Sequence, residues 1–231
     1  MNTIIFDLET TGLDVTKVSI IEYMFYNIKT HEYISGFVNP ECEIPPEVIK
    51  IHGITNMDVE DKPVFKEHID KIMEFIGPKA YLVAHNAIRY DIPLLYNELK
   101  RNGQTPLKGW KVIDTLRIAR TLYPDLKNHK QDTLREKFKL GLNNNHQANK
   151  DVLDLGVIFC NMSKGRSIKE LYKMSNEFTY TRMPFGKHRG KLICEVPDDY
   201  IKWMLGTDIF YQEEDLMRTF VKAGKIEIEK E

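Results

Sequence analysis

The order of strand-like and helix-like segments restricts the fold more than any other feature of this sequence. Three segments with the apolar pattern of strands come first, at 3–9, 18–28 and 33–38, and the last two are expected to form a hairpin. Residues 45–55 contain two prolines and are expected to form a loop with one helical turn. Helices and short buried strands then alternate: helices at 64–76, between Asp91 and Gly103, and at 115–123, 131–138 and 147–163, and strands at 80–85 and 111–116. This order predicts an α/β fold with a mixed sheet flanked by helices.

The chain is expected to contain two folded parts. Residues 1–163 carry the segments described above and form the larger domain. The pattern changes near "SKGRS", and we interpret residues 164–176 as a linker. Residues 177–231 are then a small α+β module, large enough for a minor core beside a bigger partner.

Composition excludes several classes of protein. The chain has no apolar run near 18 residues and no signal-peptide pattern, so we expect neither membrane association nor export. Its three cysteines are far apart and lack C-x-x-C spacing, which argues against a disulfide framework or a cysteine-ligated zinc and favours the cytoplasm. The net charge of -1 indicates no general affinity for polyanions, although residues 164–191 are rich in Lys and Arg.

Two carboxylates share one face of the first strand. Side chains alternate along a strand, so Asp7 and Glu9 in "IIFDLE" point the same way. The "TTG" turn follows at once, which places the pair at the carboxyl end of a strand, where open α/β sheets bind ligands. Burying two like charges side by side is costly unless a cation compensates. The pattern therefore suggests a metal site, while a solvated acidic face on an edge strand remains the alternative.

Further acidic residues occur at two other junctions. Asp91 lies where the strand "YLVAH" gives way to a helix, and Asp151 lies near the start of the helix at 147–163, with His146 just before it. Structural explanations exist for both acids, since Asp91 can cap its helix and Asp151 can interact with the helix dipole. Four carboxylates also suit two divalent cations about 3.5–4 Å apart, which grip the attacking and leaving oxygens of a phosphodiester. A histidine can then take the proton of the attacking water.

The sequence resembles the DEDDh 3′-to-5′ exonucleases of the ribonuclease H-like superfamily. "FDLETTG", "HN" with "YD", and H-x-x-x-x-D match the three motifs of that family in order, over about residues 1–163. The resemblance implies a ribonuclease H-like fold and two divalent metal ions, Mg²⁺ or Mn²⁺. It also implies that Asp7, Glu9, Asp91 and Asp151 are metal ligands and that His146 is the general base. Together these five residues would be the catalytic set.

The same motifs imply contacts with nucleic acid. Six steps separate His85 from Asp91, whereas most members of the family have five, and the longer form resembles the three-prime repair exonucleases. In that group the residue matching Arg89 contacts nucleic acid, and Leu13 matches a position where relatives place an apolar side chain against the terminal base. The residues expected at the nucleic acid in these motifs are Thr10, Gly12, Leu13, His85, Asn86 and Arg89.

The carboxyl-terminal part resembles the small module that follows the nuclease domain in some exonuclease X-like proteins. Its basic turn "GKHRG" suggests phosphate contacts through Lys187, Arg189 and Lys191, with a solvated loop as the alternative. Pro197 is expected to start a helix. Its apolar stripe of Tyr200, Trp203 and Met204 is interpreted as core rather than as a stacking platform.

The sequence as a whole predicts a metal-dependent 3′-to-5′ exonuclease that releases mononucleotides, with DNA favoured over RNA. The expected partner is single-stranded DNA or the 3′ end of a duplex, and the alternatives are an RNA 3′-trimming enzyme of the ribonuclease T type and a polymerase-associated module without catalysis. All five expected catalytic residues are present, which disfavours the non-catalytic alternative. The two-metal reaction needs no 2′-hydroxyl, so the choice between DNA and RNA stays open at this point, as do a homodimer and a polymerase partner.

Overall fold

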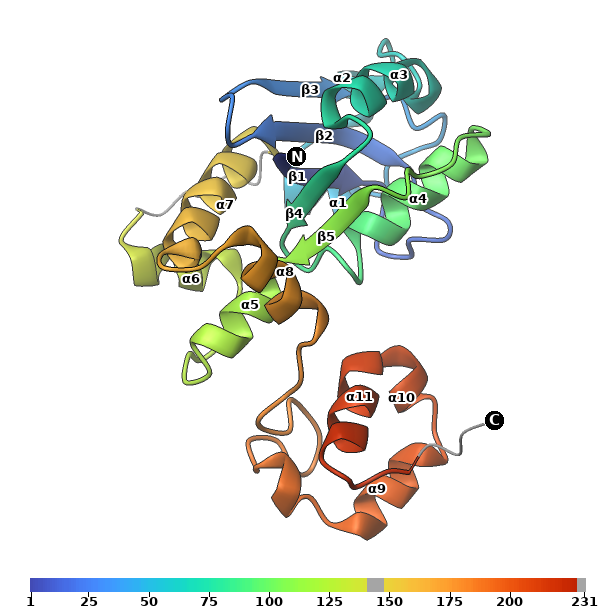
Figure 1. The fold of residues 1–231 in the computed structure, drawn as a ribbon. Coiled ribbons are helices and arrows are strands. Elements are labelled where there is room, and N and C mark those ends of the chain that lie inside the picture. Colours follow the sequence, from blue (N-terminus) through green and yellow to red (C-terminus); the bar gives the residue numbers. More distant parts are fainter. Residues whose placement is uncertain (141–147, 228–231) are drawn as a thin grey trace. The chain divides into compact units, whose positions relative to one another are not determined.

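The computed structural model describes residues 1–140 and 148–227, which divide into two compact units, Met1–Asn176 and Glu177–Glu231. The first unit contains a five-stranded sheet in the order β3-β2-β1-β4-β5 (Figure 1). The strands are β1 (Asn2–Thr10), β2 (Ile20–Asn27), β3 (Tyr33–Phe37), β4 (Ala80–Ala84) and β5 (Trp110–Asp114). The pairs β1–β2 and β2–β3 are antiparallel, whereas β1–β4 and β4–β5 are parallel. The predicted mixed sheet is therefore confirmed.

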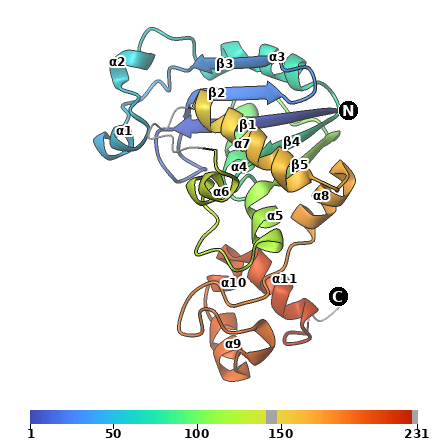
Figure 2. The same ribbon diagram turned by 90° about the vertical axis from the view of Figure 1, so that its left-hand side faces the viewer.

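Helices cover both faces of this sheet. They are α1 (Pro46–His52), α2 (Asn56–Val59), α3 (Phe65–Ile76), α4 (Asp91–Arg101), α5 (Thr115–Leu122), α6 (Gln131–Phe138), α7 (Ala148–Ser163) and α8 (Ile168–Asn176). Ile4, Phe6 and Leu8 of β1 pack in one buried cluster with α3 and α4. Ile5 packs in another with α5, α6, α7 and α8, and Figure 2 shows α7 running in front of the sheet. Alternation along β1 thus sends Asp7 and Glu9 to the α7 face.

The segment at 45–55 is more helical than the sequence analysis expected. Helix α1 spans seven residues, with Pro46 in its first turn and Gly53 closing it in the left-handed conformation at φ 79°. A proline in the first turn lacks only an N–H that has no partner inside the helix, so it starts a helix without interrupting one. The two prolines therefore mark the start of helix α1 and not a loop.

The expected linker at 164–176 is also different in the structure. Most of it forms α8, in which Leu171 and Ser175 are buried, and the N–H of Asp114 donates to Ser175 Oγ at 2.7 Å. Helix α8 therefore belongs to the first unit, because its apolar face covers β5 and α5. Only residues 164–167 lie between α7 and α8.

The second unit begins at Glu177, where the sequence analysis placed the start of the module. It contains the short 3₁₀ helix η1 (Ile193–Glu195) and helices α9 (Asp198–Leu205), α10 (Ile209–Gln212) and α11 (Glu214–Lys222) around its own apolar core. Within residues 177–227 the only β pairing is an isolated bridge between Arg182 and Leu192, so the part described there is helical where an α+β module was expected.

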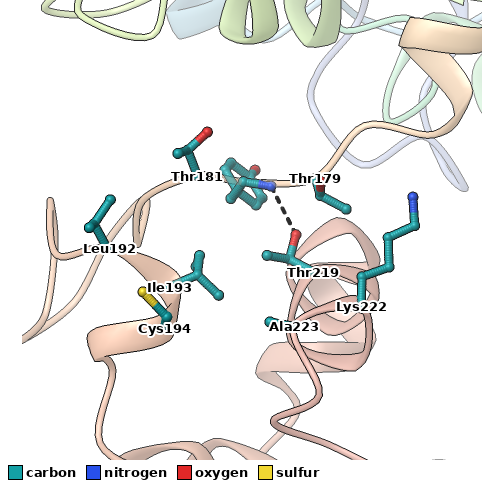
Figure 3. Close-up of a pocket in the computed structure, with 9 residues that line it drawn as sticks. Thr179, Thr181, Leu192, Ile193, Cys194, Thr219, Lys222 and Ala223 are labelled. Atoms are coloured by element: carbon teal, nitrogen blue, oxygen red, sulfur yellow. Dashed lines mark hydrogen bonds between the residues drawn. The ribbon is translucent and has the colours of Figure 1, made fainter.

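A hollow of about 350 Å³ opens in the second unit between the segment around Thr181 and α11 (Figure 3). At its edge the N–H of Tyr180 donates to Thr219 Oγ1 at 2.9 Å. None of the residues expected from the sequence to take part in catalysis or binding lines this hollow. Separately, no helix among the residues that the structure describes is both long and apolar enough to cross a membrane.

Candidate metal centre

The carboxyl end of β1 and the start of α7 bring three carboxylates together. Asp7 and Glu9 project from β1 on the face that α7 covers, and Asp151 lies in the first turn of α7. One carboxylate oxygen from each of the three lies within 4.8 Å of the others, close enough to bind a single cation. The sequence analysis placed all three residues in one site, and the structure brings them together.

Asp91 is the fourth acid expected in this group. It is buried, and α4 begins at Asp91 itself, so Tyr90 and not Asp91 occupies the N-cap position. Burial, followed by the charges of Asp114 and Glu9, raises the pKa of Asp91 to about 8. Among neighbouring charges, Asp91 contributes most to the raised pKa of Asp7. Asp91 therefore interacts electrostatically with the group of three, although its oxygens lie outside the 4.8 Å set.

The electrostatics of the cluster favour a bound cation. Burial raises the pKa of Asp7 well above its usual value, and the charges of Asp91, Glu9 and Asp151 raise it further. Burial, with the charges of Glu22 and Asp151, raises the pKa of Glu9 to about 7. Ionised carboxylates held this close destabilise one another unless a positive charge lies between them. An all-oxygen donor set suits hard divalent cations such as Mg²⁺ or Mn²⁺, so the residues present fit the metal ions that the resemblance implies.

Arg135 on α6 is a residue of this site that the sequence analysis missed. Its guanidinium lies 2.5 Å from Asp151 Oδ1, 2.9 Å from Asp132 Oδ1 and 2.9 Å from Asp154 Oδ2, and its side chain is only 5% exposed. The pair with Asp151 joins residues 16 apart on two helices. The sequence carries no signal for this pair, because the packing of α6 against α7 creates it. Arg135 holds one oxygen of Asp151 and thereby orients the carboxylate.

Asp114 is a second missed residue, and it shapes the loop between β4 and α4. Its carboxylate accepts hydrogen bonds from the N–H groups of Asn86 (3.0 Å), Ile88 (3.2 Å) and Leu116 (2.9 Å). Asn86 adopts the left-handed conformation at φ 66°, which the bond from its N–H helps to hold. An aspartate between a strand and a helix is a capping signal, and in "KVIDTL" that signal was legible in the sequence.

Glu22 is a third missed residue. It lies on β2 directly opposite Glu9 and is buried. Residues opposite each other in an antiparallel pair point to the same face, so Glu22 adds a further acid beside the cluster. An acid inside the otherwise apolar stretch "SIIEYMF" was the available signal.

The residues of the first unit that were expected to contact nucleic acid lie next to the carboxylates in the sequence, at the end of β1 and in the turn after it, and in the loop before α4. The hydroxyl of Tyr90 lies 2.6 Å from Thr10 Oγ1 and donates to the carbonyl of Gly12 at 2.5 Å, which ties the turn after β1 to the loop before α4. Leu13 in that turn is 83% exposed. The arrangement leaves an apolar side chain open to solvent beside the acidic strand end.

The "HN" motif is positioned by the neighbouring strand and helix. His85 Nδ1 lies 2.9 Å from Thr115 Oγ1, and burial lowers the pKa of His85 to about 4, so its ring is neutral at physiological pH. Asn86 is partly buried and Arg89 is exposed.

His146, the expected general base, lies outside the described residues. Lys187, Arg189 and Lys191 are exposed on the second unit.

Comparison with known families gives two matches along the chain. The family model described as "Exonuclease" matches residues 4–159, which is more than half of the chain. A second model, described as "Putative quorum-sensing-regulated virulence factor", matches residues 172–217.

Two curated relatives match more than two thirds of the chain. A "DNA polymerase III PolC-type" from Caldanaerobacter subterraneus subsp. tengcongensis is 38% identical over 162 residues, which are 69% of this chain and 11% of the relative. The chain therefore spans about a tenth of the length of that polymerase. A "DNA polymerase III subunit epsilon" from Rickettsia prowazekii is 33% identical over 188 residues, which are 77% of this chain and 80% of the relative.

A solved structure supports the fold. The nuclease domain of 3′hExo, described as a DEDDh family member bound to rAMP, superimposes with a TM-score of 0.59 at 19% identity, over 71% of this chain and 92% of that one. The expected ribonuclease H-like architecture is thus confirmed at the level of the fold.

Proposed function

The chain belongs to the exonuclease family, and we propose that its carboxylate cluster hydrolyses the terminal phosphodiester bond at the 3′ end of DNA. In this reaction water adds to the terminal phosphorus and the bond to the 3′ oxygen of the preceding nucleotide breaks, so one mononucleotide leaves per step. The observation that carries the proposal is the convergence of Asp7, Glu9 and Asp151 within 4.8 Å beside the buried Asp91. Membership of the exonuclease family predicts the reaction, and the clustered carboxylates provide the ligands for the metal ions that it needs.

Asp7, Glu9, Asp91 and Asp151 would hold two divalent ions. When bound, such ions activate water and neutralise the charge that develops on the phosphate. The protein's part is to hold the carboxylates in place before substrate arrives. Arg135 orients Asp151 from α6, and Asp114 shapes the loop that leads to Asp91. We assign His146 the role of accepting the proton from the attacking water, on the strength of its place in the third motif.

DNA is the substrate that we propose, because one of the relatives described above is named a DNA polymerase III and the other a subunit of DNA polymerase III. RNA is the second candidate, favoured by the rAMP named with the 3′hExo nuclease domain. A polymerase could be a partner for the same reason that supports DNA, although the chain spans only 11% of its PolC-type relative. A purely structural role is disfavoured, since a non-catalytic module would have no need for four mutually repelling acids.

The test compares three substrates with matched variants. End-labelled single-stranded DNA, duplex DNA with a recessed 3′ end, and RNA of the same sequence are incubated with wild type in Mg²⁺ or in excess chelator. We expect stepwise shortening of DNA from the 3′ end that requires the metal and that Asp7→Asn abolishes. Glu43→Gln, which neutralises an exposed acid, is the control and should cleave as wild type does. Cleavage in chelator, or by Asp7→Asn, would refute the metal centre, and faster cleavage of RNA would replace the proposed substrate.

A further inference from the structure

The second unit carries an aromatic group on its surface where the sequence analysis expected core. In α9, Ile201 and Met204 fill the core, so Tyr200 is only half-buried and Trp203 is 54% exposed. The Tyr200 and Trp203 rings are 5.2 Å apart and inclined by 30°, and the His188 ring meets Tyr200 edge-on at 4.5 Å. The interpretation of the whole stripe as core was therefore wrong for Trp203. Ile201 and Met204 fill the core-facing side of the helix and Tyr200 packs against its edge, which leaves Trp203 toward solvent.

The basic turn is fixed against these rings. Backbone hydrogen bonds close it, from Met183 N–H to the Lys191 carbonyl and from Gly190 N–H to the Met183 carbonyl, each at 2.8 Å. Gly186 adopts φ 73°, and a Cβ there would lie 2.5 Å from the Tyr200 hydroxyl oxygen. Glycine therefore allows a close approach between the turn and α9. A free, solvated loop would need neither this approach nor these closing bonds.

Three exposed cations extend from this turn. Lys187, Arg189 and Lys191 are exposed, and they form no ion pair with any residue that the structure describes. Two acids at the start of α9 form contacts with groups other than these cations. Asp198 pairs with Lys225 at 2.8 Å, and Asp199 accepts the N–H of Tyr200 at 2.8 Å. The turn thus presents positive charge whose counter-charge the described protein does not provide.

We propose that His188, Tyr200 and Trp203, together with Lys187, Arg189 and Lys191, form a binding site for single-stranded nucleic acid on the second unit. An exposed aromatic face stacks on an unpaired base, and cations at a fixed distance from it bind the flanking phosphates. A duplex hides the faces of its bases, whereas an unpaired strand offers base faces and phosphates side by side. This combination of rings and cations therefore favours a single strand. The site deepens the proposed function by adding grip on the substrate apart from the metal centre, and it rests on that function only for the choice of nucleic acid as partner.

Tryptophan fluorescence gives a direct readout of this site. The chain has two tryptophans, and Trp110 is buried in the first unit with its indole N–H donating to the carbonyl of Gly77. Emission that responds to a stacked base is therefore expected from Trp203. In excess chelator, titration of the full chain with a single-stranded oligodeoxynucleotide should quench this emission. Binding measured without hydrolysis stays informative even if the proposed enzymatic activity fails, so the two failures are distinguishable.

The variants separate stacking from general binding. Because the Trp203 variants lack the reporting tryptophan, their affinities and that of wild type are compared through the anisotropy of a fluorescein-labelled single-stranded oligodeoxynucleotide in excess chelator. Trp203→Ala should weaken binding of the single strand about 5- to 150-fold, the usual worth of one stacked base, and Trp203→Phe should recover most of it. Tyr211→Ala is the matched control, because Tyr211 is an 89% exposed aromatic of the same unit without a ring contact among the described residues. It should bind as wild type does. Replacing Lys187, Arg189 and Lys191 with Gln should reduce the slope of log affinity against log salt by roughly 0.7 for each phosphate that the variant no longer binds.

Several outcomes would overturn the proposal. One is equal affinity of wild type and Trp203→Ala for the single strand, and another is an unchanged salt slope in the triple Gln variant. An equal loss of affinity for a blunt duplex would show that Trp203 does not stack on an unpaired base. Binding to vesicles of phosphatidylcholine and phosphatidylserine in the absence of oligonucleotide binding would assign the surface to a membrane. Circular dichroism of each variant establishes that the second unit is folded.

Discussion

Replacing Glu9 with Gln should make the metal-free protein more stable at alkaline pH. In the folded chain the pKa of Glu9 is raised from 4.5 to about 7, by burial and by the charges of Glu22 and Asp151. Each pKa unit corresponds to about 1.4 kcal/mol, so the ionised carboxylate costs about 3 kcal/mol of folding free energy. Gln has nearly the same shape and carries no charge, so Glu9→Gln removes that cost.

The pH dependence of the effect follows from the direction of the change in pKa. Below pH 4.5 Glu9 is protonated in the folded and the unfolded chain, and its charge costs nothing. Between pH 4.5 and about 7 the unfolded chain ionises first, and the folded wild type loses stability as the pH rises. Above pH 7 the full cost is present. The advantage of Glu9→Gln should therefore be absent near pH 4, grow through this window and level off near pH 8.

Thermal unfolding in excess chelator measures this difference. A change of about 3 kcal/mol corresponds to about 6–12 °C in the Tm of a domain this large. Glu43→Gln, at an exposed position, is the control and should melt with wild type at every pH. Mg²⁺ should reverse the order, because a ligand that binds only the folded state stabilises it and wild type offers the cation one more carboxylate. Equal Tm values for wild type and Glu9→Gln at pH 8 in chelator would refute the electrostatic account of the cluster.

Two further predictions concern residues around the cluster. Arg135→Gln should leave Asp151 without its guanidinium partner and lower the free energy of unfolding in chelator by about 3–5 kcal/mol. Mn²⁺ should restore part of this loss. A urea titration that finds no destabilisation would contradict the role of Arg135. His146→Ala should lower the single-turnover rate about 10²- to 10⁴-fold with little change in substrate affinity. The wild-type rate should rise with pH through the range in which histidine loses its proton. A fall in affinity as large as the fall in rate would make His146 a binding residue.

Most of the fold could be read from the chain, because its signals are local. Hydrophobic periodicity located the strands of the sheet, and the start signal at Asp91 and the stop signal at Gly103 located α4 to within two residues. The errors came where a local signal had two meanings. Pro46 was interpreted as a loop residue although proline also starts helices, and residues 168–176 were interpreted as a linker although their apolar face needed a partner to become visible.

The sequence by itself determined which carboxylates could meet. Alternation along β1 places Asp7 and Glu9 on one face whatever surrounds them, since side-chain direction in a strand is a property of the local backbone. Tertiary structure decided the burial, the charged neighbours and therefore the pKa values of those carboxylates. The contact of Arg135 with Asp151, the burial that raises the pKa of Glu9 and the exposure of Trp203 all depend on how separate segments pack. Packing brings together residues that no fixed spacing in the chain relates, so the charges and surfaces on which this chemistry depends exist only in the folded protein.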